Sequence, residues 1–136
     1  MIIDTHQGNV FESDLRTIVF AINTEGHNDA GFAGMVGRRF RWDALMNAGP
    51  TPLGAILSHT ADGYTLHGVC CHSLDGRWSM EAITKALDRI APAEDAHPIA
   101  VVWMGHGLVG MLQGVNPADT KAAIEASKAR CYLCHL

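Results

Sequence analysis

Two glycine-rich segments hold the residues of this sequence that could do chemistry. The first extends from Asn23 to Gly34, and the second extends from Gly105 to Gly110. Glycines permit positive φ angles and a close approach of the backbone to a ligand, and backbone amides can bind phosphate without any net basic charge. The second segment has no carboxylate, so a diphosphate there would meet amide donors rather than repulsion. The pair of segments predicts a site for a phosphorylated small molecule.

Three polar side chains of the first segment extend this prediction. The carboxamide of Asn23 could bond a sugar hydroxyl, since it offers both donors and an acceptor. His27 and Asp29 are the acid–base groups of the segment and therefore its candidate catalytic residues. Neither segment is a known nucleotide fingerprint, because no Gly-Lys-Ser/Thr follows and neither is a true GxGxxG at a first strand.

Strands must precede both segments if their amides are to face a ligand. Short runs rich in β-branched and aromatic residues predict five strands, at residues 16–23, 53–59, 64–71, 99–104 and 131–136. The Asp62-Gly63 pair favours a tight hairpin between the second and third of these, so part of the sheet is expected to be antiparallel. Each glycine-rich segment follows a buried strand and would lie outside the carboxyl ends of the sheet, where ligands bind in open α/β sheets.

Three helices are expected between the strands, over residues 32–46, 79–90 and 117–129. Ser79 can cap the second helix, and Asn116 with Pro117 provides a cap and a first-turn proline for the third. The order of elements predicts the α/β class, with a three-layer α/β/α architecture around a mixed sheet. With 136 residues, the chain is expected to form one domain over residues 1–136.

Composition limits the partners and the cellular location. Lys and Arg number 10 against 14 Asp and Glu, which gives a net charge of -4 and argues against binding an extended nucleic-acid duplex. The apolar runs are shorter than the roughly 20 residues that a membrane span needs, and the first fifteen residues resemble no export signal. Four cysteines without such a signal are expected to be reduced thiols, so the prediction is a cytoplasmic protein without a membrane partner. Its oligomeric state stays open.

Three motifs, in order along almost the whole chain, resemble those of the macrodomains, a family that binds ADP-ribose. The opening residues 6–11 resemble its Gly-Asp-Ile/Leu-Phe element. Residues 18–26, followed by 31–33 and 39–40, resemble a strand ending in Asn-Thr-x-Gly, then Gly-Ile-Ala and Arg-Phe. Residues 104–110 resemble its second loop, Ile-Gly-x-Gly-Leu-x-Gly. The chain is most similar to the compact branch that removes ADP-ribose from acidic side chains or DNA bases.

The resemblance implies where each part of ADP-ribose would lie. The opening element would contact the adenine, the first segment the distal ribose and the second segment the diphosphate. The implied ligand-binding residues are Asn9 and Val10 in the opening element, Asn23, Gly26, Asn28, Gly31, Phe32 and Ala33 in the first segment, and Gly105, His106, Gly107, Leu108, Val109 and Gly110 in the second.

The sequence also departs from this family in three places. Asn9 stands where the family has an adenine-contacting Asp, so an acceptor oxygen is kept and the charge is lost. The similar branch works with a Lys and an Asp, and those places hold Cys71 or His72 and Val109. Three alternatives follow. The protein hydrolyses an ADP-ribosyl linkage or ADP-ribose 1″-phosphate with His27 or Asp29, or it is a non-catalytic reader that sequesters an NAD-derived nucleotide. The third alternative is a macrodomain-like fold that has lost its ligand.

The cysteines suggest two further sites, both weaker than the nucleotide site. Residues 131–135 form a CxxCH string, which is the haem c attachment pattern, but haem attachment of that kind follows export. A zinc site would need groups from Cys70, Cys71, His72 and the C-terminal run to converge, yet adjacent Cys70 and Cys71 face opposite sides of a strand. Buried packing is the simpler role for these cysteines. The sequence therefore predicts neither a metal nor a cofactor.

Overall fold

The computed structural model describes residues 1–90 and 97–136, apart from the side chains of Leu45, Leu108, Val109 and Met111. Its strands are β1 (Ile2–Gln7), β2 (Thr17–Asn23), β3 (Ile56–Ala61), β4 (Tyr64–His72), β5 (Ile99–Val102) and β6 (Cys131–His135). Its helices are a 3-10 turn (Val10–Glu12), α1 (Gly31–Arg39), α2 (Asp43–Met46), α3 (Met80–Ile90), α4 (Leu108–Gln113) and α5 (Pro117–Glu125).

The strands of the described chain form one sheet in the order β1-β6-β5-β2-β4-β3. All neighbouring strands run parallel except β3 and β4, which form an antiparallel hairpin. Asp62 and Gly63 both have positive φ angles at the tip of that hairpin, as its sequence predicts. The mixed sheet is thus confirmed. The parallel strands end at one common edge of the sheet.

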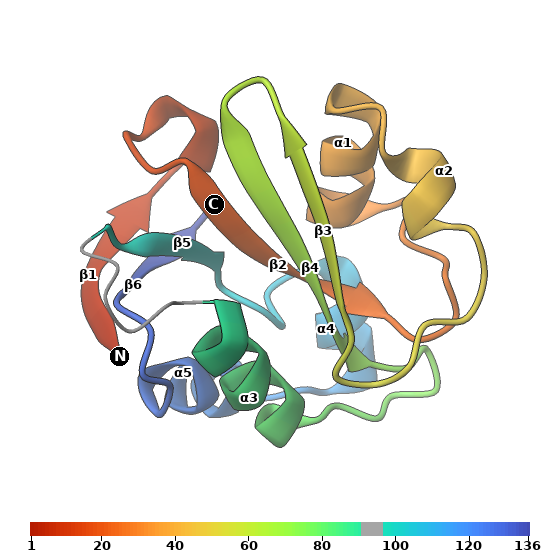
Figure 1. The fold of residues 1–136 in the computed structure, drawn as a ribbon. Helices are drawn as coiled ribbons and strands as arrows, with labels where there is room; N and C mark the ends of the chain where they lie inside the picture. Colours follow the sequence, from red (N-terminus) through yellow and green to blue (C-terminus); the bar gives the residue numbers. More distant parts are fainter. Residues whose placement is uncertain (91–96) are drawn as a thin grey trace.

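Helices cover both faces of the sheet (Figure 1). On one face, Ile18, Phe20 and Ile22 of β2 pack with the buried residues of α1 and α2. On the other face, Val19 and Val69 pack with the buried residues of α3 and α5. Successive residues of a strand point to opposite faces, so β2 contributes to both cores. The expected three-layer α/β/α architecture is confirmed.

The first expected helix, over residues 32–46, is wrong in its length, because it breaks into α1 and α2. Arg41 has a φ of 55°, a left-handed conformation that ends α1. The amides of Phe40 and Trp42 bond back to Val36 and Gly37, which closes the helix end in a Schellman-like arrangement. The break buries Phe40 and Trp42 in the core, which a continuous helix would not have placed together.

Other boundaries also differ from the expectation. The strand β1 is not predicted by its sequence, because most of its residues are exposed or half-buried and it lacks an apolar run. The segment from Gly105 to Gly110 is only partly a loop, since α4 begins at Leu108. Helix α5 begins as expected with the cap of Asn116, but it ends at Glu125. Within the described chain, none of the helices has the length and apolar character needed to cross a bilayer.

Gly26 allows the β2–α1 loop to pass the chain at Gly49. Its φ is +73°, and an added Cβ would lie 2.3 Å from the carbonyl oxygen of Gly49. Gly63 has a similar φ of +80° but open space where a Cβ would be. Substitutions at these two glycines therefore distinguish the cost of backbone strain from the cost of steric conflict.

We expect Gly26→Ala to destabilise the protein more than Gly63→Ala. The left-handed backbone costs each variant about 1 to 2 kcal/mol, and the conflict with Gly49 costs Gly26→Ala about 1 to 3 kcal/mol more. Urea unfolding of both variants measures the difference. Equal losses of unfolding free energy would show that the loop moves away from Gly49 without cost.

Candidate functional site

A cavity of about 490 Å³ lies where β2, β4, β5 and β6 end. This volume lies within the range of about 300 to 1,000 Å³ that is usual for small-molecule sites. Within the described lining, no side chain belongs to Asp, Glu, Lys or Arg. Its residues are Phe20, Ala21, Asn23, His27, Asn28, Ala30, Gly31, Phe32, Ala33, His72, Leu74, Trp78, Val102, Trp103, Met104, Gly105, His106, Gly107, Gly110, Cys134, His135 and Leu136.

The start of α1 supplies backbone donors to this cavity. The cap residue is Ala30, which forms no side-chain hydrogen bond to the helix. Residues Ala30 to Ala33 line the cavity, so the first amides of the helix are not capped by a side chain on that side. The start of a helix also carries a partial positive charge. An anion in the cavity would find both donors and a favourable potential there.

Two asparagines hold the β2–α1 loop in place. The side chain of Asn23 accepts from the amide of His27 at 3.1 Å and donates to its carbonyl at 3.0 Å. The side chain of Asn28 accepts from the amide of Asn23 at 2.9 Å and donates to the carbonyl of Met46 at 3.0 Å. Asn23 still has one N–H and one lone pair for a ligand. Asn28 is buried and ties the loop to α2.

The second glycine segment packs tightly against itself. Gly105 has a φ of +92°, and a Cβ at Gly110 would lie 2.7 Å from the Gly105 carbonyl oxygen. The hydroxyl of Thr120 donates to the carbonyl of Met104 at 2.6 Å and fixes the end of β5 to α5. Gly107, by contrast, has open space around its Cβ position. The loop is therefore rigid at its base and open at Gly107.

A register shift between β2 and β4 brings His72 to the cavity. Ile22 pairs with Cys70 and Asn23 pairs with His72, so Cys71 is an extra residue in β4. Bulges of this kind reorient side chains at functional sites. His72 is only 7% exposed. Its ring stacks on Trp78 with centroids 4.2 Å apart and planes 8° apart.

The environment of His72 favours the neutral imidazole. Burial lowers the pKa of His72, and the backbone of Ser73 and the carboxylate of Glu25 offset this only in part. Its Nδ1 atom is sealed from solvent and has no geometrically sound hydrogen bond within the described part of the chain. His72 is a buried, uncharged base at the wall of the cavity.

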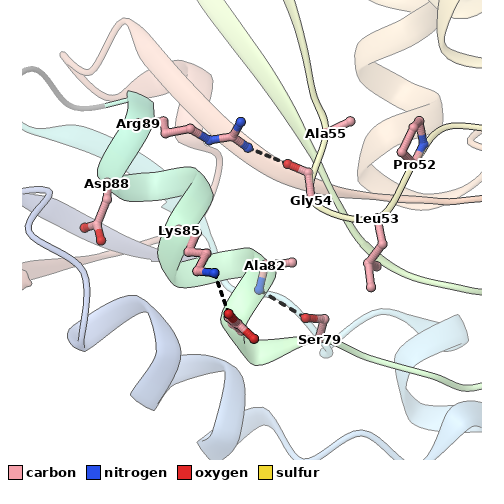
Figure 2. Close-up of a pocket in the computed structure, with 10 residues that line it drawn as sticks. Pro52, Leu53, Gly54, Ala55, Ser79, Ala82, Lys85, Asp88 and Arg89 are labelled. Carbon is pink, nitrogen blue, oxygen red and sulfur yellow. Dashed lines mark hydrogen bonds and ion pairs between the residues drawn. The ribbon is translucent and has the colours of Figure 1, made fainter.

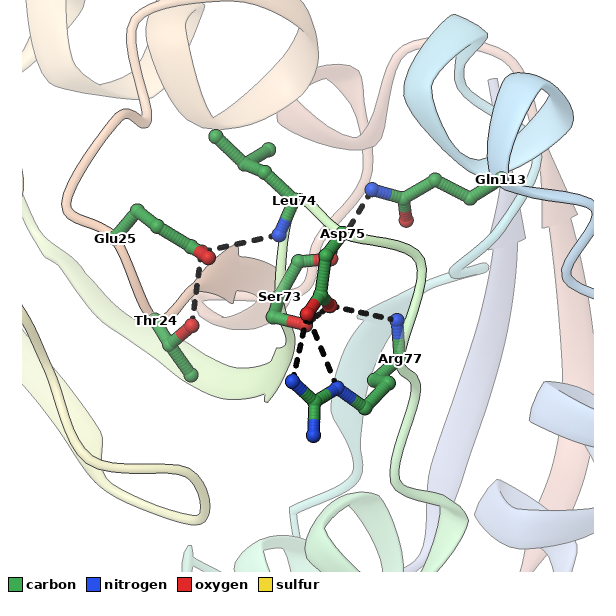
Figure 3. Close-up of polar contacts among 7 residues, drawn as sticks. All are labelled: Thr24, Glu25, Ser73, Leu74, Asp75, Arg77 and Gln113. Atoms are coloured by element: carbon green, nitrogen blue, oxygen red, sulfur yellow. Dashed lines mark hydrogen bonds and ion pairs between the residues drawn. The ribbon is translucent and has the colours of Figure 1, made fainter.

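The loop between β4 and α3, residues 73–79, is tied to its neighbours on both sides (Figure 3). Glu25 accepts from the hydroxyl of Thr24 at 2.8 Å and from the amide of Leu74 at 3.0 Å. Gln113 of α4 donates to the carbonyl of Ser73 at 3.1 Å and accepts from the Trp78 indole at 2.7 Å. Side chains thus link residues 73–79 to the β2–α1 loop on one side and to α4 on the other.

The turn of this loop is closed by its own polar residues. Asp75 accepts from the hydroxyl of Ser73 and forms an ion pair with Arg77 at 2.7 Å (Figure 3). The hydrogen bond from Arg77 holds the pKa of the Asp75 carboxyl below its ordinary value. Gly76 has a φ of +97° at the tip. Because these groups are exposed, they shape the turn and contribute little to overall stability.

The side of the cavity formed by the ends of β5 and β6 and by the β5–α4 loop carries aromatic rings. The ring of His106 lies 4.2 Å from Trp103 and 4.7 Å from His135, measured between centroids. Partial burial and the neighbouring His135 lower the pKa of His106. The amide of Gly8 donates to the carbonyl of His135 at 2.9 Å, so the opening element lies directly behind this side.

The predicted site residues divide into three groups. Most line the cavity, namely Asn23, His27, Asn28, Gly31, Phe32, Ala33, Gly105, His106, Gly107 and Gly110. Among the described residues, four lie outside the lining, which are Asn9, Val10, Gly26 and Asp29. Leu108 and Val109 begin α4, but their side chains lie outside the described part.

The four residues outside the lining have structural contacts. Asn9 caps the 3-10 turn by accepting from the amide of Phe11. Val10 is fully buried in the core. The Gly26 backbone passes Gly49, and the carbonyl of Asp29 accepts from Arg38 at 3.1 Å. Their roles in ligand binding or catalysis stay predictions.

Sequence reasoning did not assign the residues that line the cavity from β4, its following loop and β6. Among these, His72 had a usable signal, since it follows a predicted strand at the same edge as Asn23. Trp78 and His135 had no such signal. Trp78 reaches the site through a turn, and His135 lies at the end of the last strand.

A wider hollow of about 800 Å³ lies between α3 and residues 52–55 (Figure 2). Arg89 donates to the carbonyl of Gly54 across it, and Lys85 pairs with Glu81 along the exposed side of α3. In the described chain, none of its lining residues belongs to either glycine segment. The smaller cavity is the candidate site because it combines backbone donors with convergent side chains.

The four cysteines are free and buried on different faces of the sheet. Cys70 and Cys134 belong to the core beside α1, whereas Cys71 and Cys131 belong to the core beside α3. Burial raises the pKa of the Cys70 and Cys134 thiols to about 11. Among the described residues, no three His, Cys, Asp or Glu side chains converge to hold a metal ion.

Solved structures share this fold. The macrodomain of Mycobacterium tuberculosis DarG is 17% identical, with a TM-score of 0.72, and the match covers 99% of this chain and 97% of that one. A macrodomain protein from Streptomyces coelicolor is 19% identical, with a TM-score of 0.73 and 98% of each chain covered. Thermosipho africanus DarTG in complex with ADP-ribose is 14% identical, with a TM-score of 0.68 over 96% of this chain and 42% of that one.

The chain therefore has the macrodomain fold, which confirms the expectation drawn from its motifs at the level of the architecture. No protein-family model matches the sequence, and no curated protein matches it either. The identities are below 20%, so the likeness establishes the architecture and leaves the ligand to the chemistry of the cavity.

We expect the free energy of unfolding to decrease as the pH falls below about 6.5. Burial lowers the folded-state pKa values of His72 and His67 from 6.5, so the unfolded chain binds more protons in that range. His72→Phe keeps a ring on Trp78 but cannot titrate, so its pH dependence should be shallower. Urea unfolding from about pH 7.5 to about pH 5 measures both slopes. Equal slopes in the two proteins would contradict a buried neutral His72.

Proposed function

We propose that this protein binds ADP-ribose or a closely related NAD-derived nucleotide in the 490 Å³ cavity. One observation carries the proposal. The uncapped start of α1 and the open glycine loop at Gly107 both line a cavity whose described side chains include no carboxylate. A diphosphate is an anion that backbone donors can bind without a cationic side chain. The ADP-ribose bound to a protein of the same fold supports the choice of nucleotide.

The polarity of the cavity fits the two ends of such a ligand. Asn23 offers its free N–H and lone pair beside α1, where a ribose hydroxyl would be satisfied. Trp103, His106 and His135 offer flat ring surfaces at the other side, which suit a base. The diphosphate would then lie between them, along the loop from Gly105 to Gly107. This order agrees with the one implied by the macrodomain resemblance.

The finer proposal is hydrolysis of an ADP-ribosyl linkage or of ADP-ribose 1″-phosphate. Such a reaction needs a group that moves a proton. His27 lines the cavity and remains a candidate, whereas Asp29 lies outside the described lining. His72, one of the two residues (Cys71 or His72) that the sequence offers in place of the lysine of the similar branch, is a second imidazole at the same cavity.

A non-catalytic reader is the alternative, and the lining favours it in one respect. Among its described residues, no Lys or Asp side chain is available of the kind that the similar branch uses. The same cavity would then hold an ADP-ribose mark or sequester a soluble nucleotide. Binding without turnover would support this function.

Isothermal titration calorimetry with ADP-ribose, ADP and AMP tests the shared step of both functions. We expect ADP-ribose to bind most tightly, since it alone reaches from the ring cluster to Asn23. The absence of binding by all three would overturn the proposed function. Tighter binding of AMP than of ADP-ribose would place the ligand elsewhere in the cavity.

Gly107→Val should weaken ADP-ribose at least about tenfold, which corresponds to about 1.4 kcal/mol. Its Cβ meets no protein atom within 4 Å, and its backbone is not left-handed, so the variant should fold. The added methyl groups would occupy space at the loop that we assign to the diphosphate. Gly107→Ala provides a graded comparison with a smaller effect.

Thermal unfolding is the control for this substitution. We expect the melting temperature of Gly107→Val to stay within about 3 °C of the parent, as for a surface change of about 0.5 kcal/mol. Unchanged ADP-ribose affinity in a folded variant would remove the second loop from the site.

A further inference from the structure

His72 is an ionisable side chain that the binding of a nucleotide does not explain. His72 is a buried residue, with 7% of its surface exposed, and it lines the cavity. Within the described chain, the structure gives it a stacking partner but no sound side-chain hydrogen bond. Burying a polar ring without partners costs free energy. The fold therefore gives Nδ1 no hydrogen bond of good geometry, and the ring lies where the cavity can bring a ligand to it.

The geometry decides which nitrogen can act. Nδ1 is sealed from solvent. His72 lines the cavity and its Nδ1 is sealed from solvent, so Nε2 is the nitrogen through which the ring can meet a ligand or water. Stacking on Trp78 at 4.2 Å fixes the plane of the ring. The indole is itself held by Gln113, which also binds the Ser73 carbonyl. The ring is thus positioned by Trp78, and Trp78 is in turn held by Gln113, which does not line the cavity in the described chain.

We propose that His72 is the general base of this cavity and that its Nε2 accepts a proton from the water that cleaves an ADP-ribosyl ester. The proposal rests on the proposed function, and it assigns the role of general base in the hydrolytic reaction to one residue. The register shift beside Asn23 places this ring next to the side chain that we assign to the ribose. A neutral imidazole needs no further group to deprotonate it before it acts.

The step balances with one base. The water oxygen forms a bond to C1″ of the distal ribose while one water proton passes to Nε2. The bond between C1″ and the ester oxygen breaks, and its electron pair leaves on the carboxylate. A carboxylate is a stable leaving group at neutral pH, so the reaction needs no acid. The imidazolium then returns its proton to solvent through the open side of the cavity.

Several other titratable groups lie on the elements around His72. Their protonation must be distinguished from that of His72 in any pH profile. Glu25 lies on the neighbouring β2–α1 loop and acts weakly on His72. The other histidines of the cavity are His27 from that loop, His106 from the β5–α4 loop and His135 from β6. Asp75 and Arg77, on the loop that follows His72, form an ion pair with each other.

His59 provides a matched control outside the cavity. Its ring also stacks on a tryptophan, Trp42, with centroids 5.2 Å apart. His59 lies on β3 and does not line the cavity in the described chain. His72→Gln and His59→Gln therefore make the same chemical change at two stacked histidines.

The experiment measures single-turnover release of ADP-ribose from a peptide that carries an ADP-ribosyl glutamate ester. We expect His72→Gln to slow the release by at least about 100-fold, the usual value of a general base. His59→Gln should stay near the parent rate. Both variants should bind ADP-ribose within about threefold of the parent by calorimetry, since the loss is confined to the chemical step.

The pH dependence of the rate and the protonation state of the ring nitrogens can both be measured. A purely structural role of His72 would change neither of them. The parent rate should rise with pH with a midpoint below 6.5, because burial lowers the pKa of His72. This rise should be absent from the residual activity of His72→Gln. Nitrogen NMR of the parent should show the same midpoint for His72, with the lone pair on Nε2. A His72 ring that keeps its proton on Nε2 when neutral would overturn the proposal.

The remaining outcomes separate this proposal from the proposed function. ADP-ribose binding without any ester cleavage by the parent would overturn the base and leave binding intact. Cleavage that survives in His72→Gln but is lost in His27→Ala would assign the base to His27 instead. No binding of ADP-ribose at all would overturn the proposed function and this proposal together.

Discussion

The parallel pairing of β2 with both β4 and β5 is the constraint on which the site depends. Parallel strands end at one edge, so the chain segments that follow β2, β4 and β5 are forced to lie together. Those segments are the first glycine loop, the turn beyond His72 and the second glycine loop. The cavity forms where they meet. The hairpin partner β3 and the edge strand β1 complete the sheet, yet neither contributes to the lining within the described chain.

Backbone groups dominate the proposed recognition of an anion, which suits a protein with a net charge of -4. A cationic side chain would attract many phosphates, whereas the start of α1 offers donors with fixed positions and about half a unit charge. Such donors cost no side-chain entropy when the ligand binds. They also require the loops to stay fixed. The side-chain amides of Asn23, Asn28 and Gln113 meet this requirement, because they form hydrogen bonds to the backbone of the loops.

Much of this arrangement could be predicted from the sequence, because it depends on local patterns. The Asp62-Gly63 hairpin and the cap at Asn116 are encoded by a few adjacent residues, and each is found where it was expected. The break at Arg41 could not be predicted, since it depends on burying Phe40 and Trp42 in the tertiary core. The strand β1 gave no pattern because its residues are exposed or half-buried, so they do not form a buried apolar run.

The place of His72 shows most clearly where local reasoning ends. A histidine after two cysteines suggests either core packing or a zinc ligand, and its neighbours in sequence do not distinguish these from a cavity wall. The register shift at Ile22 and Asn23 decides the matter, because it adds Cys71 to β4 and brings the next residue to the cavity. That shift is a property of two strands paired across the sheet.

The same burial that makes His72 suitable as a base also makes it a weakness of the fold. Desolvation keeps the ring neutral and so keeps Nε2 ready to accept a proton. Each time the ring is protonated, the folded state loses part of its advantage over the unfolded chain. The stack on Trp78 and the two bonds of Gln113 limit this cost by holding the ring and its loop together. A larger opening toward solvent would relieve the cost, but it would also raise the pKa toward its ordinary value and hydrate the ring. The enclosure of His72 is thus a compromise between the stability of this edge of the sheet and the readiness of this imidazole to act.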